Sequence, residues 1–76
     1  MAAKAFILIE TAVGTNKRVI SNIEKLKGIK SAESVTGPYD VIAVIEANSL
    51  TEIGEIVTGK LHTIDGVSRT VSCLVV

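Results

Sequence analysis

The sequence predicts an α+β fold in which four strands and two helices follow one another in the order β-α-β-β-α-β. Isoleucine, valine and threonine are abundant, which favours strands, and two segments with apolar residues at helical spacing separate the strand-like runs. The two halves of the chain also resemble each other, because residues 6–10 (FILIE) align with residues 42–46 (IAVIE). A strand-helix-strand unit that occurs twice produces this order.

Two continuous apolar runs predict the central strands. Residues 6–9 and 41–45 have strand length and carry apolar side chains on both faces, a pattern typical of strands that are covered on both sides. Glu10 ends the first run far short of the ~20 apolar residues that cross a bilayer, and no signal-peptide pattern follows. We therefore expect a buried strand here and no membrane contact.

Helices are expected at residues 16–27 and 50–61, where apolar residues recur on one stripe. A Thr-Asn pair can cap the first helix, and Gly28 can adopt the left-handed conformation that ends it. Ser49 and Glu52 have the spacing of a capping box, in which each side chain accepts a hydrogen bond from the backbone amide of the other residue.

The remaining segments predict a hairpin and a last strand. Residues 30–36 alternate weakly and lead into a Gly-Pro turn, so residues 30–36 and 40–46 are expected to pair. An Asp-Gly turn then leads into residues 67–76, where Thr70 and Ser72 fall on one face of the expected strand.

These elements form the split β-α-β arrangement of a ferredoxin-like domain spanning residues 1–76, with an antiparallel sheet in the order 4-1-3-2. Right-handed crossovers place both helices on one face, so the chain itself leaves the other apolar face uncovered. If about 600 Å² of apolar sheet surface were exposed to water, burying it would contribute roughly 15 kcal/mol to the free energy of association, before the costs of association are subtracted. We therefore expect a homodimer in which two sheets stack through this open face.

Composition argues against several classes of function. Eight basic and eight acidic residues balance, so no net field attracts a nucleic acid or a membrane. One cysteine and one histidine form neither an internal disulfide nor a structural zinc site, which fits a cytoplasmic protein. We read His62 as a solvated helix-end residue and Cys73 as a small core residue, and no motif for a cofactor is present.

The turn at residues 36–40 is the one segment where a hydroxyl, loop amides, an aromatic ring and a carboxylate converge. These groups suit a small zwitterion, whose ammonium would pair with Asp40 and whose carboxylate would accept hydrogen bonds from amides and hydroxyls. The alternative is a purely structural hairpin turn with Tyr39 packed on the edge of the core.

Residues 35–40 (VTGPYD) and 64–72 (IDGVSRTVS) resemble the effector-binding (RAM) domain of the Lrp/AsnC family of leucine-responsive and asparagine regulators, and the resemblance covers nearly the whole chain. It implies the fold predicted above, pairing through sheets, and rings of dimers with amino-acid effectors at the contacts between dimers. The positions that it implies for effector binding are Thr36, Gly37, Tyr39, Asp40, Thr70 and Ser72.

Two features depart from the family pattern. Pro38 occupies a place usually held by a polar or acidic residue, which removes one loop amide and restricts Gly37. The family's helix-turn-helix is not seen ahead of the first strand, so the chain resembles the stand-alone members, which do not bind DNA by themselves. We expect a non-catalytic, cofactor-free amino-acid sensor that modulates transcription of amino-acid metabolism indirectly, through a full-length regulator. The alternatives are a small enzyme of the cofactor-free monooxygenase type and a ligand-free structural oligomerisation module.

Overall fold

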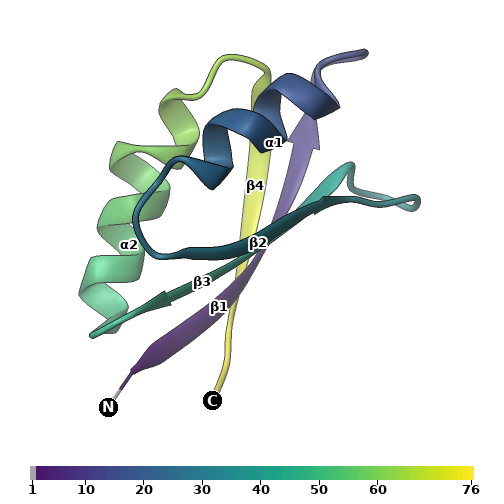
Figure 1. The fold of residues 1–76 in the computed structure, drawn as a ribbon. Coiled ribbons are helices and arrows are strands. Elements are labelled where there is room, and N and C mark those ends of the chain that lie inside the picture. The colour runs from purple at the N-terminus through teal and green to yellow at the C-terminus, as the bar shows by residue number, and fades with distance from the viewer. Residues whose placement is uncertain (1) are drawn as a thin grey trace.

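The computed structural model describes residues 2–76, and Met1 lies outside the described residues. The elements follow the predicted β-α-β-β-α-β order (Figure 1). They are β1 (Ala3–Thr11), α1 (Asn16–Glu24), β2 (Ile29–Ser34), β3 (Val41–Ala47), α2 (Leu50–Gly59), a short 3-10 helix η1 (Leu61–Thr63) and β4 (Val67–Leu74). The strands form one antiparallel sheet in the order β2-β3-β1-β4, which confirms the predicted order 4-1-3-2.

Both helices end earlier than the sequence predicts. α1 stops at Glu24 because the amide of Leu26 bonds to the carbonyl of Ile23, three residues back, and so tightens the last turn. Gly28 takes a positive φ of 94° and leads into β2, but it lies four residues beyond the end of α1, so the prediction that it ends the helix is wrong. α2 stops at Gly59, and the chain continues as η1.

The predicted caps form only in part. Thr15 precedes α1 but makes no side-chain cap, because its hydroxyl donates to the carbonyl of Ala12 at 2.7 Å. Ser49 caps α2 as predicted, its hydroxyl accepting a hydrogen bond from the amide of Glu52 at 3.1 Å. The return bond of the capping box, from the Ser49 amide to the Glu52 carboxylate, is not among the hydrogen bonds of residues 2–76.

One face of the sheet packs against both helices and forms the core. In the middle of β1 and β3 the odd-numbered residues, such as Ile7, Ile9 and Ile45, are completely buried in one cluster with Val19 of α1 and Ile53 of α2. This cluster places the two helices on the same side of the sheet, as the right-handed crossovers predict. No helix in the described part of the chain is long and apolar enough to cross a membrane.

The opposite face of the sheet, which we call the open face, stays partly exposed, as expected. The residues on it include Phe6, Leu8, Ile42, Val44, Val71 and Cys73. Phe6 is 39% exposed, and no segment among residues 2–76 covers it. The interpretation of Cys73 as a core residue is wrong, because in this chain its thiol lies exposed on the open face.

Candidate functional site

The predicted effector loop connects β2 to β3 and extends beyond the end of the sheet (Figure 1). The amide of Val35 donates to the carbonyl of Asp40 at 2.9 Å, which closes the loop at its base. Gly37 has a φ of 142°, a conformation that side-chain-bearing residues rarely adopt. Thr36, Gly37 and Pro38 are exposed, so their polar groups are accessible to a ligand.

Asp40 joins this loop to the end of β1. Its amide donates to the carbonyl of Ile9 at 2.9 Å, and its carboxylate oxygen Oδ2 accepts a hydrogen bond from the amide of Thr11, also at 2.9 Å. A charged acceptor strengthens such a bond. One oxygen of the carboxylate therefore has a structural role, while Oδ1 has no partner among the described residues.

Asn16, at the start of α1, supports the same loop from the helix side. Its Oδ1 accepts a hydrogen bond from the Thr11 hydroxyl at 2.6 Å. Its Nδ2 donates to the Ser34 hydroxyl at 3.1 Å and to the Asp40 carbonyl at 3.4 Å. Sequence reasoning considered Asn16 only as a cap and missed this role, because its partners come from three other segments and no local pattern signals them.

Thr70 and Ser72 lie on β4, which is an edge strand. Ile9 pairs with Val41 on one side and with Thr70 on the other, so Thr70 and the loop flank β1 at the same end of the sheet. Because β1 lies between β3 and β4, Thr70 and the start of β3 are separated by two strand spacings, about 10 Å. The Thr70 hydroxyl is in contact with Nε2 of His62, at 2.5 Å.

Ser72 lies elsewhere. It pairs with Ile7, two residues further along β1, and faces a small hollow of about 250 Å³ beside α2. Leu50, Gly54 and Leu74 also line that hollow. The structure thus gathers Thr36, Gly37, Tyr39, Asp40 and Thr70 at one end of the sheet and separates Ser72 from them.

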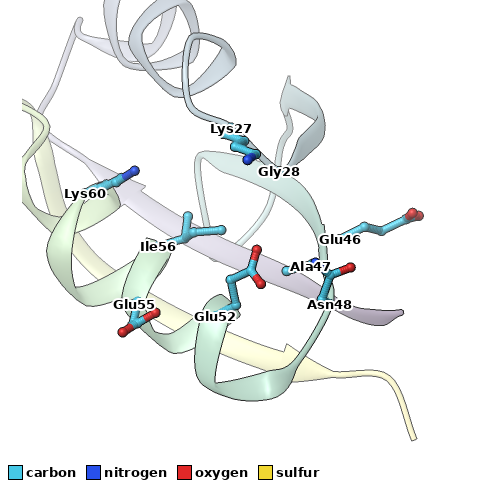
Figure 2. A pocket seen from close by; sticks show the side chains of 9 residues that line it. All are labelled: Lys27, Gly28, Glu46, Ala47, Asn48, Glu52, Glu55, Ile56 and Lys60. Carbon is cyan, nitrogen blue, oxygen red and sulfur yellow. The ribbon is translucent and has the colours of Figure 1, made fainter. Parts of the chain in front are cut away.

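A larger hollow, of about 510 Å³, lies at the other end of the sheet, where β3 leads into α2 (Figure 2). The residues that line it include Lys27, Gly28, Asn48, Glu52, Ile56 and Lys60. Sequence reasoning missed this hollow because its walls come from the connection before β2 and from the end of β3 and α2, which are distant in the sequence.

Comparison with known proteins agrees with this fold. The family model of the Lrp/AsnC ligand binding domain matches residues 4–76. An uncharacterized HTH-type transcriptional regulator of Pyrococcus furiosus is 33% identical over 75 residues, which cover 95% of this chain and 50% of that protein. The chain therefore spans about half the length of this curated relative.

Two solved structures are also similar. TTHA0845 of Thermus thermophilus superposes with a TM-score of 0.92 at 30% identity, over 97% of this chain and 92% of that one. The transcriptional regulator NMB0573 of Neisseria meningitidis, solved in complex with L-Met, superposes with a TM-score of 0.85 at 20% identity, over 97% of this chain and 49% of that one. The second likeness shows a shared fold only. Since the family model matches residues 4–76, this chain belongs to the Lrp/AsnC ligand binding domain family.

Proposed function

We propose that this chain is a non-catalytic regulatory module that binds a small amino-acid effector at contacts between dimers. Through a full-length regulator it would modulate transcription of amino-acid metabolism. Membership in the family and the HTH-type regulators among its relatives support a regulatory role. The observation that carries the proposal is the loop at residues 36–40, which is exposed at residues 36–38 and is hydrogen-bonded at its base through Asp40 and Asn16.

The loop offers the groups that a zwitterion needs. The Oδ1 oxygen of Asp40 remains available for an ammonium group while Oδ2 holds β1 in place. The hydroxyl of Thr36 and the loop amides around Gly37 suit a carboxylate, and Tyr39 supplies a half-buried ring at the side. Thr70 and Ser72 lie on the edge strand, and in our proposal they reach the effector across the contact with a neighbouring chain.

The proposed dimer forms through the open face. Phe6 and Val44 are directly paired neighbours on this face, and Leu8 and Ile42 are the next such pair. A second copy would cover these apolar side chains with its own open face, because a two-fold axis brings the same surface of both subunits together. An effector that sits between dimers then favours whichever oligomer completes its pocket, and this linkage is the proposed regulatory mechanism.

The two roles of Asp40 can be separated by substitution. Asp40→Asn keeps an oxygen that accepts the Thr11 hydrogen bond but removes the negative charge that would hold an ammonium. We expect it to lower effector affinity more than tenfold, about 1.4 kcal/mol or more, with little change in thermal stability. Isothermal titration calorimetry against the twenty amino acids, followed by titration of the variant, measures the affinities.

Asp40→Ala is the companion variant, because it removes the charge and the acceptor together. It should lose both effector affinity and stability, the latter by about 1–3 kcal/mol through the unpaired Thr11 amide. Unchanged affinity in Asp40→Asn would remove the ammonium role from this residue. If no amino acid bound the intact oligomer, the chain would be a structural module instead.

A further inference from the structure

The internal repeat creates two equivalent corners in the fold. In the first corner, β1 ends, α1 begins, and the amide of Ala12 donates to the carbonyl of Gly66 at 2.8 Å. In the second corner, β3 ends, α2 begins, and the amide of Glu46 donates to the carbonyl of Gly28 at 2.9 Å. Both glycines have a positive φ, 100° and 94°, and both immediately precede an edge strand. The two corners are therefore alike in their glycines and in a backbone bond to each glycine carbonyl, although Ala12 follows β1 whereas Glu46 lies inside β3.

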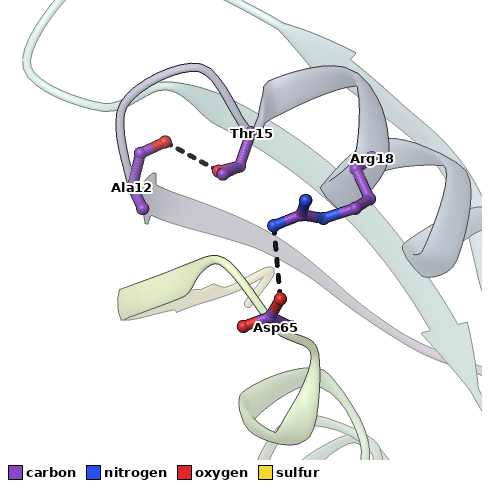
Figure 3. A network of polar contacts seen from close by, with 4 residues as sticks. All are labelled: Ala12, Thr15, Arg18 and Asp65. Atoms are coloured by element: carbon purple, nitrogen blue, oxygen red, sulfur yellow. Dashed lines mark hydrogen bonds and ion pairs between the residues drawn. The ribbon is translucent and has the colours of Figure 1, made fainter.

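The first corner is closed by its own side chains. Both glycines are tightly packed: a Cβ atom at Gly66 would lie 2.9 Å from Val19, and one at Gly28 would lie 3.1 Å from Ile56. Arg18 of α1 and Asp65, the residue before Gly66, form an ion pair of 3.2 Å across the corner (Figure 3). The ion pair therefore bridges this corner at the surface of the protein.

The second corner is open and is the 510 Å³ hollow. Glu52 is the third residue of α2, as Arg18 is the third residue of α1. Lys27 directly precedes Gly28, as Asp65 directly precedes Gly66. The charges are thus exchanged, yet no ion pair joins Glu52 to Lys27 among the salt bridges of the described residues.

The Glu52 carboxylate is also free of the capping bond that its spacing predicts. Figure 2 shows it directed into the hollow beside Ile56, whereas the carboxylates of Glu46 and Glu55 point away. Glu46 is engaged with Lys30 at 3.9 Å. The hollow therefore presents the Glu52 carboxylate, the ammonium groups of Lys27 and Lys60, and the apolar side chain of Ile56.

We propose that the second corner is a binding site for a small zwitterion, an α-amino acid with an apolar side chain. Its ammonium would face Glu52, its carboxylate would face Lys27, and its side chain would rest on Ile56. The ligand takes the place of the ion pair that closes the first corner. A volume of 510 Å³ lies within the range of roughly 300–1,000 Å³ of small-molecule sites. This site is at the opposite end of the sheet from the effector loop and does not rest on the function proposed above.

A residue-resolved titration tests the proposal. The ¹⁵N-labelled full chain is titrated with L-leucine while the amide signals of Gly28 and Glu52 are followed by NMR. We expect saturable shifts at both, with a dissociation constant on the order of 1 mM, because two exposed charge contacts and one apolar contact are modest individually. Isoamylamine, which lacks the carboxylate, and 4-methylpentanoate, which lacks the ammonium, should each bind at least fivefold more weakly.

Three variants complete the test. Glu52→Gln keeps the size and helix propensity of the side chain and should weaken binding of L-leucine by about tenfold. Glu24→Gln, at the end of α1, is the matched control and should bind as the parent chain does. The double variant Glu52→Arg with Lys27→Asp reproduces the charges of the closed corner and should abolish the shifts while the circular dichroism spectrum stays unchanged.

The proposal is overturned if the Gly28 and Glu52 signals do not move at about 50 mM L-leucine, well above the expected dissociation constant. It is equally overturned if Glu52→Gln binds like the parent chain. Shifts confined to Thr36 and Gly37 would support the effector loop and reject the corner. Shifts confined to the corner would support the corner and would show only that the loop does not bind L-leucine, because the titration against all twenty amino acids tests the loop. The two proposals can therefore fail separately.

Discussion

Replacing Gly66 by alanine is expected to lower the free energy of unfolding by about 3 kcal/mol. Two effects add up at this position. A φ of 100° is strained for any residue with a Cβ atom, and that atom would lie 2.9 Å from Cγ2 of Val19, which is itself completely buried. Thermal unfolding followed by circular dichroism at a fixed protein concentration should show a midpoint lowered by about 15 °C.

Gly14 provides the matched control for this prediction. It also has a positive φ, of 79°, but a Cβ atom there would meet nothing within 4 Å. Gly14→Ala should therefore show the backbone cost alone, about 1 kcal/mol. If Gly14→Ala and Gly66→Ala lost equal stability, the close contact with Val19 would contribute nothing, and our account of the closed corner would be wrong.

Replacing Val44 by lysine is expected to convert the proposed dimer into a monomer. Val44 lies on the open face of the central strand β3, directly opposite Phe6 of β1. In the stacked dimer a lysine ammonium would lose its water without gaining a partner, which costs several kilocalories per mole. Sedimentation velocity at micromolar concentration measures the change in mass.

Leu50→Lys is the control for this substitution. Leu50 is also apolar and 56% exposed, but it lies on α2 and not on the open face of the sheet. This variant should sediment as the parent chain does. A parent chain that is monomeric at micromolar concentration, or a Val44→Lys variant that remains dimeric, would contradict the proposal that two sheets stack.

Much of the architecture could be predicted because its causes are local. The apolar run at residues 41–45, the helical stripe of α2 and the Asp-Gly turn before β4 each depend on neighbouring residues only. The repeat between the halves then led to the strand order. The ends of the helices were less predictable, since α1 ends where Leu26 bonds back to Ile23 and not where the glycine stands.

The candidate sites depended on contacts that no local pattern reveals. The bond from the Thr11 amide to the Asp40 carboxylate joins residues 29 positions apart, and it gives Asp40 a structural role that its loop position does not indicate. Ser72 was grouped with Thr70 by spacing, yet it faces a different hollow, beside α2. The Glu52 carboxylate has the spacing of a capping box but is directed into the open corner instead.

By itself the sequence determined the kind and order of the elements, because helical and strand periodicities and turn residues act within a few positions along the chain. Only the tertiary structure decided which face of β1 meets the helices, with Ile7 buried and Phe6 exposed, although both residues are apolar. It likewise decided that one corner of the repeat closes through Arg18 and Asp65 while the other stays open. These outcomes depend on strand register and on side-chain volumes from distant segments, which become neighbours only when the sheet and both helices pack together.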